Sequence, residues 1–240
     1  MNTEEKKKTA LERLPGDTIE VICDFLGIKD QNILLGLSKT LRIEQKKYRY
    51  LNLTREYSLR FYEDEVFRDR INKLVLYPHK QISLDLGGTS VDDVSALGNV
   101  HTLNLTGTSV DDVSGLGNVH TLYLSNTFVE DVSALRRVHT LALANTRVHD
   151  VGALGNVHTL DLSYTSVSDV SALGNVHSLH LVHCKSISDV SALGNVHTLD
   201  LRDCRYVVDV SALGNVHTLD LKRTRVVDVS TLGNVHILII

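Results

Sequence analysis

A seven-residue block, Leu-Gly-Asn-Val-His-Thr-Leu, recurs along the second part of the chain at almost constant spacing. Its copies, some with small changes, begin at Leu97, Leu116, Leu135, Leu154, Leu173, Leu193, Leu213 and Leu232, so consecutive copies lie 19 or 20 residues apart. A unit this short cannot bury an apolar face alone, whereas stacked units share one interior. Residues 81–240 are therefore predicted to form a solenoid of about eight full repeats plus a terminal strand.

One unit reads Val-His-Thr-Leu-x-Leu-x-x-Thr-x-Val-x-Asp-Val-Ser-Ala-Leu-Gly-Asn, and positions below are counted from its Val. The leucines at positions four and six alternate, which places both on one face of a short strand. The pattern resembles the leucine-rich-repeat signature L-x-x-L-x-L-x-x-N/C-x-L, with Thr or Cys where Asn is usual. The resemblance implies an α/β solenoid with a parallel sheet on its concave face.

An aspartate column follows each strand. Its members are Asp93, Asp112, Asp131, Asp150, Asp169, Asp189, Asp209 and Asp228. Each precedes Val-Ser-Ala-Leu or a close variant, so each can cap a one-turn helix. A row of cation ligands is the alternative, but capping explains every copy.

A histidine column opens each strand. It comprises His101, His120, His139, His158, His177, His197, His217 and His236. A metal ladder is conceivable, but stacked parallel rings do not converge on one point, as a closed zinc site requires. We therefore expect a structural role, and no bound metal or cofactor. Charging this row at low pH should strain the solenoid.

The cysteines are few and odd in number: Cys23, Cys184 and Cys204. Adjacent repeats lie about 4.8 Å apart, which would bring Cys184 and Cys204 near disulfide range. Such a sparse set does not form a disulfide framework, so two buried free thiols in a reducing compartment are favoured. The segment Cys184-Lys-Ser-Ile-Ser-Asp resembles the cysteine-containing repeats of F-box proteins.

Because the repeats are nearly identical, the positions that differ are informative. Positions five and seven should point outward from the sheet, and positions eight and ten should lie on the adjoining loop. Variation there predicts a target-binding surface, although drift at unrestrained positions is the alternative. The predicted target-binding residues are Asn104, Tyr123, Asp161, Tyr164, His180, His183, Arg202, Lys222, Arg223 and Arg225. Cations and acids are too mixed there for nucleic acid, and an acidic protein segment is the expected partner.

Residues 11–50 have a different, helical rhythm that begins Leu-Pro-Gly-Asp and ends Ser-Lys-Thr-Leu-Arg. This segment resembles an F-box, although Leu41 replaces the usual Trp; a generic helical cap is the alternative. The resemblance implies a small all-helical module that binds the Skp adaptor of a cullin–RING ubiquitin ligase. The implied adaptor-binding residues are Leu14, Pro15, Ile19, Ile22, Phe25, Leu26, Leu34 and Leu37.

The remaining segments complete the predicted organisation. Residues 1–10 should be a flexible tail, and residues 51–80 a linker helix and N-terminal cap. Within the linker, residues 55–73 are predicted to form one amphipathic helix with Leu59, Tyr62, Val66, Phe67 and Ile71 on its apolar side. We expect this helix to dock on the first repeat.

Catalysis is not expected, because no nucleophile–base pair, phosphate loop or metal-ligand spacing stands out beside the repeat columns. The N-terminus lacks the apolar core of a secretory signal, and no apolar stretch approaches the ~20 residues that span a bilayer. The leading hypothesis is the substrate receptor of a Skp–cullin–F-box ligase, with its target held on the concave face. The alternative is a non-catalytic scaffold that self-associates through the edge at Leu238 and Ile240.

Similar short repeats behind an F-box-like start occur in multi-copy families of large DNA viruses that infect amoebae. The resemblance implies a cytoplasmic protein, in the host cytoplasm if the chain is viral.

Overall fold

The computed structural model describes residues 50–74 and 81–240. The chain divides between residues 84 and 85 into two compact units. The predicted flexible tail and nearly all of the F-box-like segment, with its eight adaptor-binding residues, lie outside the described residues. Those expectations therefore stay predictions.

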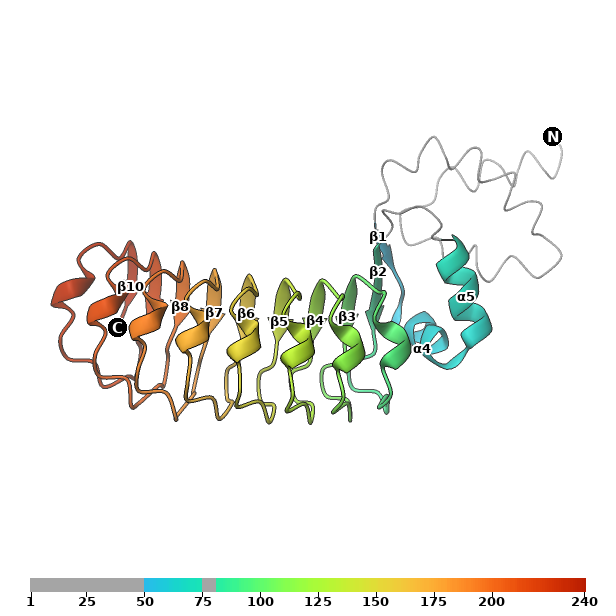
Figure 1. Cartoon of the computed structure of the whole chain (residues 1–240), viewed down its shortest axis with the longest axis horizontal. Helices are drawn as coiled ribbons and strands as arrows, with labels where there is room; N and C mark the ends of the chain where they lie inside the picture. Colours follow the sequence, from blue (N-terminus) through green and yellow to red (C-terminus); the bar gives the residue numbers. More distant parts are fainter. Residues whose placement is uncertain (1–49, 75–80) are drawn as a thin grey trace, which may run out of the picture. The chain divides into compact units, whose positions relative to one another are not determined.

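The second unit is a stack of strands that follow one another in the chain and in the sheet (Figure 1). Every neighbouring pair from β3 to β10 is parallel, with Leu103 beside Leu122 and Leu160 beside Leu179. The strands are β3 (Thr102–Asn104), β4 (Thr121–Tyr123), β5 (Thr140–Ala142), β6 (Thr159–Asp161), β7 (Ser178–His180), β8 (Thr198–Asp200), β9 (Thr218–Asp220) and β10 (Ile237–Ile239). The predicted parallel sheet is confirmed.

Each turn of the solenoid also contains a single turn of 3₁₀ helix, and these helices form a second row in Figure 1. They are η2 (Ser95–Leu97), η3 (Ser114–Leu116), η4 (Ser133–Leu135), η5 (Gly152–Leu154), η6 (Ser171–Leu173), η7 (Ser191–Leu193), η8 (Ser211–Leu213) and η9 (Ser230–Leu232). A tight 3₁₀ turn suits the short return path of a 19-residue unit.

The core lies between these two rows and runs along the solenoid. Leu103, Leu105, Val110 and Leu116 of one unit have no exposed surface, and the equivalent side chains stay buried in each following unit as far as Leu221. Burying one such leucine stabilises the fold by about 2 kcal/mol. Because each unit covers its neighbour, the leucine columns of successive units form one continuous interior, as predicted.

The first unit contains β1 (Tyr50–Asn52), α4 (Arg55–Glu63), α5 (Glu65–Leu74) and β2 (Gln81–Asp85), which ends at the division between the units. β1 pairs with β2 in parallel, with Leu51 beside Ile82. No strand was predicted at residues 50–52, although Leu-x-Leu at 51–53 repeats the alternation of the solenoid strands.

The prediction of one helix over residues 55–73 is wrong, because the chain breaks at Asp64. Asp64 has an extended backbone, with φ −107° and ψ 100°, and its carboxylate accepts a hydrogen bond from the Phe67 backbone N–H at 2.9 Å. A carboxylate in that position caps the second helix. The break changes the buried face, so Phe61, Phe67 and Ile71 are buried while Val66 is 60% exposed. Docking of this segment on the first repeat stays a prediction.

Candidate functional site

The outward face of the sheet is built by the alternation within each strand. Position four is buried in every strand from β3 to β9, while positions three and five are partly or wholly open in nearly all of them. The fifth position carries Asn104, Tyr123, Ala142, Asp161, His180, Asp200 and Asp220 along the stack. Core packing does not restrict these side chains, so they can vary to suit a binding partner.

Position eight has a left-handed backbone in all eight units from residue 88 to residue 223. The residues and their φ angles are Gly88 65°, Gly107 70°, Asn126 59°, Asn145 55°, Tyr164 61°, His183 63°, Asp203 60° and Arg223 58°. Glycine adopts this conformation freely, and Asn and Asp tolerate it, whereas a bulky side chain there is strained by about 1–2 kcal/mol. The second half of the array therefore holds Tyr164 and Arg223 at an energetic cost.

The side chains of this row pair with their neighbours. Asn145 donates a hydrogen bond to Asn126 at 2.7 Å. The Tyr164 and His183 rings lie 5.0 Å apart. Arg223 reaches the Asp203 carboxylate at 3.4 Å. The row thus presents amides, then two rings, then an ion pair along one edge of the sheet face.

A charge network lies beside this row on β7, β8, β9 and the loop after β8. The Arg202 guanidinium donates two hydrogen bonds to the Asp200 carboxylate, Nη2 to Oδ2 at 2.6 Å and Nε to Oδ1 at 2.9 Å. The same Nε lies 3.7 Å from the Asp220 carboxylate. His180 Nδ1 lies 3.7 Å from Asp200 Oδ2. Burial opposes ionisation of Asp200, but hydrogen bonds from His180 and Arg202 outweigh it and hold its pKa well below its usual range. The same contact with Asp200 raises the pKa of His180.

Further cations surround the loop that follows β8. Arg205 Nη2 lies 3.7 Å from Asp203 Oδ1, so Arg205 and Arg223 share one carboxylate. The Arg225 guanidinium lies 6.0 Å from the centre of the Tyr206 ring. Tyr206 is 59% exposed, which leaves this end of the array rich in accessible arginine and aromatic surface.

The histidine column is a stack of eight rings, and neighbouring ring centres lie 4.5–4.8 Å apart. In most units Nδ1 contacts the hydroxyl of the next residue, as in His120 to Thr121 at 3.2 Å. Desolvation within the stack, and then the neighbouring rings, lower the pKa of His158 and His197. Across residues 50–74 and 81–240, no group of three or more potential ligands is placed to hold a metal ion.

The aspartate column caps the 3₁₀ turns, as predicted. Asp131 accepts a hydrogen bond from the Ser133 backbone N–H at 2.8 Å, and the same bond recurs in all eight units. This backbone hydrogen bond, together with one from the serine hydroxyl, lowers the pKa of Asp112 and Asp131, among others. The carboxylates are therefore occupied by their own helices.

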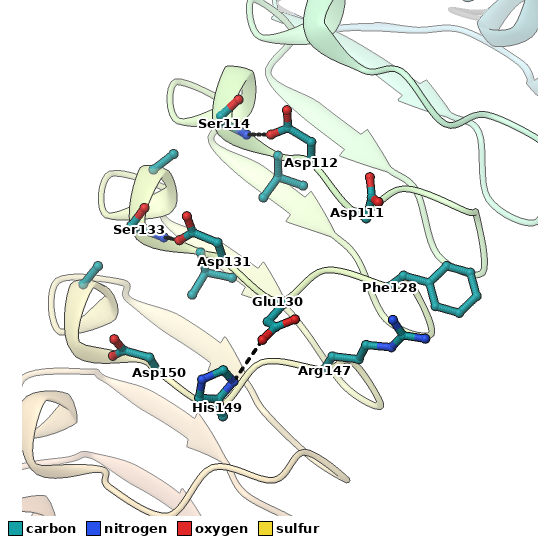
Figure 2. A pocket seen from close by; sticks show the side chains of 14 residues that line it. Asp111, Asp112, Ser114, Phe128, Glu130, Asp131, Ser133, Arg147, His149 and Asp150 are labelled. Carbon is teal, nitrogen blue, oxygen red and sulfur yellow. Dashed lines mark hydrogen bonds and ion pairs between the residues drawn. The ribbon is translucent and has the colours of Figure 1, made fainter.

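A shallow hollow of about 700 Å³ lies where the loops of units two to four meet (Figure 2). Asp112 and Asp131 line it with their capping carboxylates, while Arg147 extends along the Phe128 ring at 4.9 Å. Glu130 and His149 form an exposed pair at 3.8 Å. The carboxylates of Asp112, Asp131 and Asp150 already accept backbone hydrogen bonds, and Glu130 pairs with His149, so most charged groups of the hollow are engaged within the protein.

Cys184 and Cys204 are free, buried thiols, as the sparse cysteine set predicted. Each Sγ donates to a carbonyl of the preceding unit, Cys184 to Leu162 at 3.1 Å and Cys204 to Leu181 at 2.9 Å. Burial raises the pKa of Cys184, and that of Cys204 to about 12. Neutral thiols of this kind act in packing.

The predicted target-binding residues fall into groups of contacting side chains. The Tyr164 ring contacts the His183 ring. His180 and Arg202 both contact the Asp200 carboxylate, and Arg223 pairs with Asp203. Asn104 bonds Asp85 at 2.9 Å, and Tyr123 is 39% exposed on β4, so these two lie apart on earlier strands. Tyr206 was missed, although it occupies the extra position of a 20-residue unit. The left-handed geometry of position eight was also missed, although the run Gly88, Gly107, Asn126, Asn145 was a visible signal.

Among the described residues, neither α4 nor α5 is long and apolar enough to traverse a bilayer. No protein-family model matches the sequence, and no curated protein matches it by sequence.

Solved structures do match it. An internalin of Listeria monocytogenes superimposes with a TM-score of 0.53 at 19% identity, covering 65% of this chain and 53% of the internalin. The chain therefore spans about half of that protein. Internalin C2 of the same bacterium (TM-score 0.47, 25% identity, 66% and 69% covered) and a leucine-rich-repeat protein of Leptospira interrogans (0.48, 18%, 69% and 55%) are also similar. The second unit has the fold of a leucine-rich-repeat solenoid.

Proposed function

We propose that the chain is a protein-binding repeat protein whose partner is held on the sheet face and the position-eight row of units five to eight. The observation that supports this most is the left-handed backbone under Tyr164, His183 and Arg223. Packing would be satisfied by glycine at these positions, as in the first two units. A bulky side chain kept in a strained conformation is a common mark of a functional site.

An extended face of this kind suits a protein better than a small molecule. Tyrosine and arginine are enriched in the energetically dominant centres of protein interfaces. Small ligands prefer enclosed apolar cavities, and the face consists of open strands.

The proposal is tested by affinity capture from extract with matched variants. Tyr164→Gly and Arg223→Gly remove the side chains at strained positions and leave the backbone conformation favoured. Asn126→Gly and Asn145→Gly make the same change in the first half of the row and serve as controls. We expect the first pair to lose captured proteins that both controls retain. Equal capture by all four variants would contradict the proposal.

For the finer role, we propose a substrate receptor of a Skp–cullin–F-box ubiquitin ligase that acts by bringing target and ligase together. Its support is the sequence resemblance of residues 11–50 alone. The test is retention of the purified Skp adaptor by the chain. We expect retention that is abolished by Pro15→Asp combined with Ile22→Asp. No retention, or retention that survives the double variant, would contradict this role.

Self-association is a second candidate, favoured by the surface of β10. Ile237 is 45% exposed and Ile240 is 69% exposed, and within the described residues β10 pairs only with β9. An open, apolar strand edge is a template for another chain. A mass measurement over rising concentration should show a dimer that Ile237→Lys dissociates, and a constant monomer mass would remove this candidate.

A further inference from the structure

Three arginines gather on the two neighbouring loops that follow β8 and β9. Arg205 and Arg223 both approach Asp203, at 3.7 Å and 3.4 Å. Arg225 lies over Tyr206, on the loop that also carries Arg205. The side chains of Arg205 and Arg223 are 61% and 79% exposed, so their guanidinium groups remain open to a ligand.

These arginines are poorly neutralised compared with the neighbouring network. Arg202 has a close bidentate contact with Asp200 and a second carboxylate, Asp220, nearby. By contrast, the two contacts to Asp203 exceed the 2.7–2.9 Å of a strong charge-assisted hydrogen bond. The cluster of Arg205, Arg223 and Arg225 thus sets three positive charges against one carboxylate, which leaves a net charge of about +2 at neutral pH.

The backbone conformation of Arg223 also indicates a functional role for this cluster. Arg223 sits at φ 58°, where the equivalent positions of the first two units are glycine. Holding an arginine there costs stability, and its contact with Asp203 is exposed and long, so that ion pair contributes little in return. A ligand that needs the guanidinium would explain why it is kept.

We propose that Arg205, Arg223 and Arg225 form a binding site for a phosphorylated segment of a partner protein. The inference rests on the proposed function, because it names the chemistry of the partner held on that face. A phosphomonoester carries about −1.5 to −2 charges at neutral pH and three acceptor oxygens, which match the net charge and the three guanidinium groups. A single carboxylate, with one charge, would leave the cluster half neutralised. The exposed Tyr206 ring adds a surface for the residues that flank the phosphate.

The test uses the whole chain labelled with ¹⁵N-arginine and follows the arginine Nε–H resonances. The probes are three blocked peptides, Gly-phosphoserine-Gly, Gly-Glu-Gly and Gly-Ser-Gly, and a pentauridylate single-stranded RNA. We expect saturable shifts at Arg205, Arg223 and Arg225 with the phosphoserine peptide, and weaker or no binding of the other three. Arg205→Gln and Arg225→Gln should each weaken the phosphoserine peptide about tenfold, the scale of one charge-assisted hydrogen bond.

Arg137→Gln is the charge-matched control, because it also removes one positive charge and Arg137 is exposed and lies in another unit. This control should bind the phosphoserine peptide as tightly as the parent chain. The proposal is overturned by no saturable shift, by equal loss in the control, or by equal binding of the Glu peptide. Tighter binding of the RNA would also overturn it, in favour of a nucleic-acid surface.

The outcome is separable from that of the proposed function. If the phosphoserine peptide binds but Tyr164→Gly and Arg223→Gly retain every captured protein, the anion site stands and the binding face fails. If capture depends on those residues while the peptide does not bind, the face stands and the phosphate site fails.

Discussion

At the scale of single residues, Asp200 has the largest influence on the charge of the face. It is 7% exposed, yet it stays ionised because Arg202 and His180 both contact its carboxylate. Removing one partner of such a network leaves the others without compensation. Asp200 therefore orients Arg202 and raises the pKa of His180.

Replacing Asp200 with Asn should lower the pKa of His180, because the hydrogen bond and charge that raise it are lost. The change should also reduce the free energy of unfolding by about 1–2 kcal/mol. Proton NMR titration of the His180 ring and denaturant unfolding measure the two effects. Asp161→Asn, on the neighbouring strand, is a control expected to move the His180 pKa less. An unchanged pKa in Asp200→Asn would show that the network does not form.

Sequence alone predicted the columns of the repeat but not their local geometry. The leucine alternation gave the strand faces because a two-residue period has one interpretation once the repeats are aligned. The strain at Tyr164 and Arg223 had only an indirect signal, the Gly and Asn residues at the same position of the first four units, because Tyr and Arg do not themselves indicate a left-handed backbone. The pairing of Arg202 with Asp200 depends on side-chain rotamers, which no spacing encodes.

At the scale of elements, the turn that ends each 3₁₀ helix is set by the approach of the next unit. A methyl group on Gly155 would lie 2.4 Å from the Ala172 carbonyl oxygen, whereas one on Gly233 would meet nothing within 4 Å. The close spacing of neighbouring 3₁₀ turns therefore favours glycine directly after most of these helices. Arg136 occupies one copy, where its backbone keeps a right-handed conformation with φ −56° and ψ −16°.

Gly155→Ala should consequently lower the free energy of unfolding by about 1–3 kcal/mol, the usual cost of overpacking. Gly233→Ala is the matched control and should change stability by less than about 0.5 kcal/mol. Thermal or urea unfolding of both variants measures the difference. Equal destabilisation would mean that the close approach between units does not govern this position.

The break between α4 and α5 shows where helix prediction failed. The apolar spacing over residues 55–73 fits one helix, but Asp64 caps a new helix instead of continuing the first. A capping carboxylate inside a helical pattern competes with the helix for its own backbone. Asp64 lies between Glu63 and Glu65 in the sequence, so the three acidic residues indicate a solvated charged face and give no sign of the capping role of Asp64.

At the scale of the whole repeat array, the histidine stack makes stability depend on pH. The folded state lowers the pKa of His158 and His197 below 6.5, so the unfolded chain binds more protons near that pH. Stability is therefore full above pH 6.5 and falls as the pH drops through that value. His180 has the opposite shift and offsets part of the loss.

We expect the melting temperature to fall between pH 7.5 and pH 5.5. His158→Gln combined with His197→Gln should reduce that fall, because two of the suppressed protonations are removed. Differential scanning calorimetry at both pH values measures it. A melting temperature independent of pH would exclude a contribution of the stack.

Below pH 4, protonation of caps such as Asp131, whose folded pKa is lowered, should remove further stability.

The central claim is that the array gives up stability at position eight of units five to eight to present side chains to a partner. The most direct measurement is the free energy of unfolding of the triple variant Tyr164→Gly, His183→Gly, Arg223→Gly. We predict an increase of at least about 1 kcal/mol over the parent chain, larger than that of Asn126→Gly combined with Asn145→Gly. A triple variant less stable than the parent would show that these side chains serve packing, and would contradict the claim.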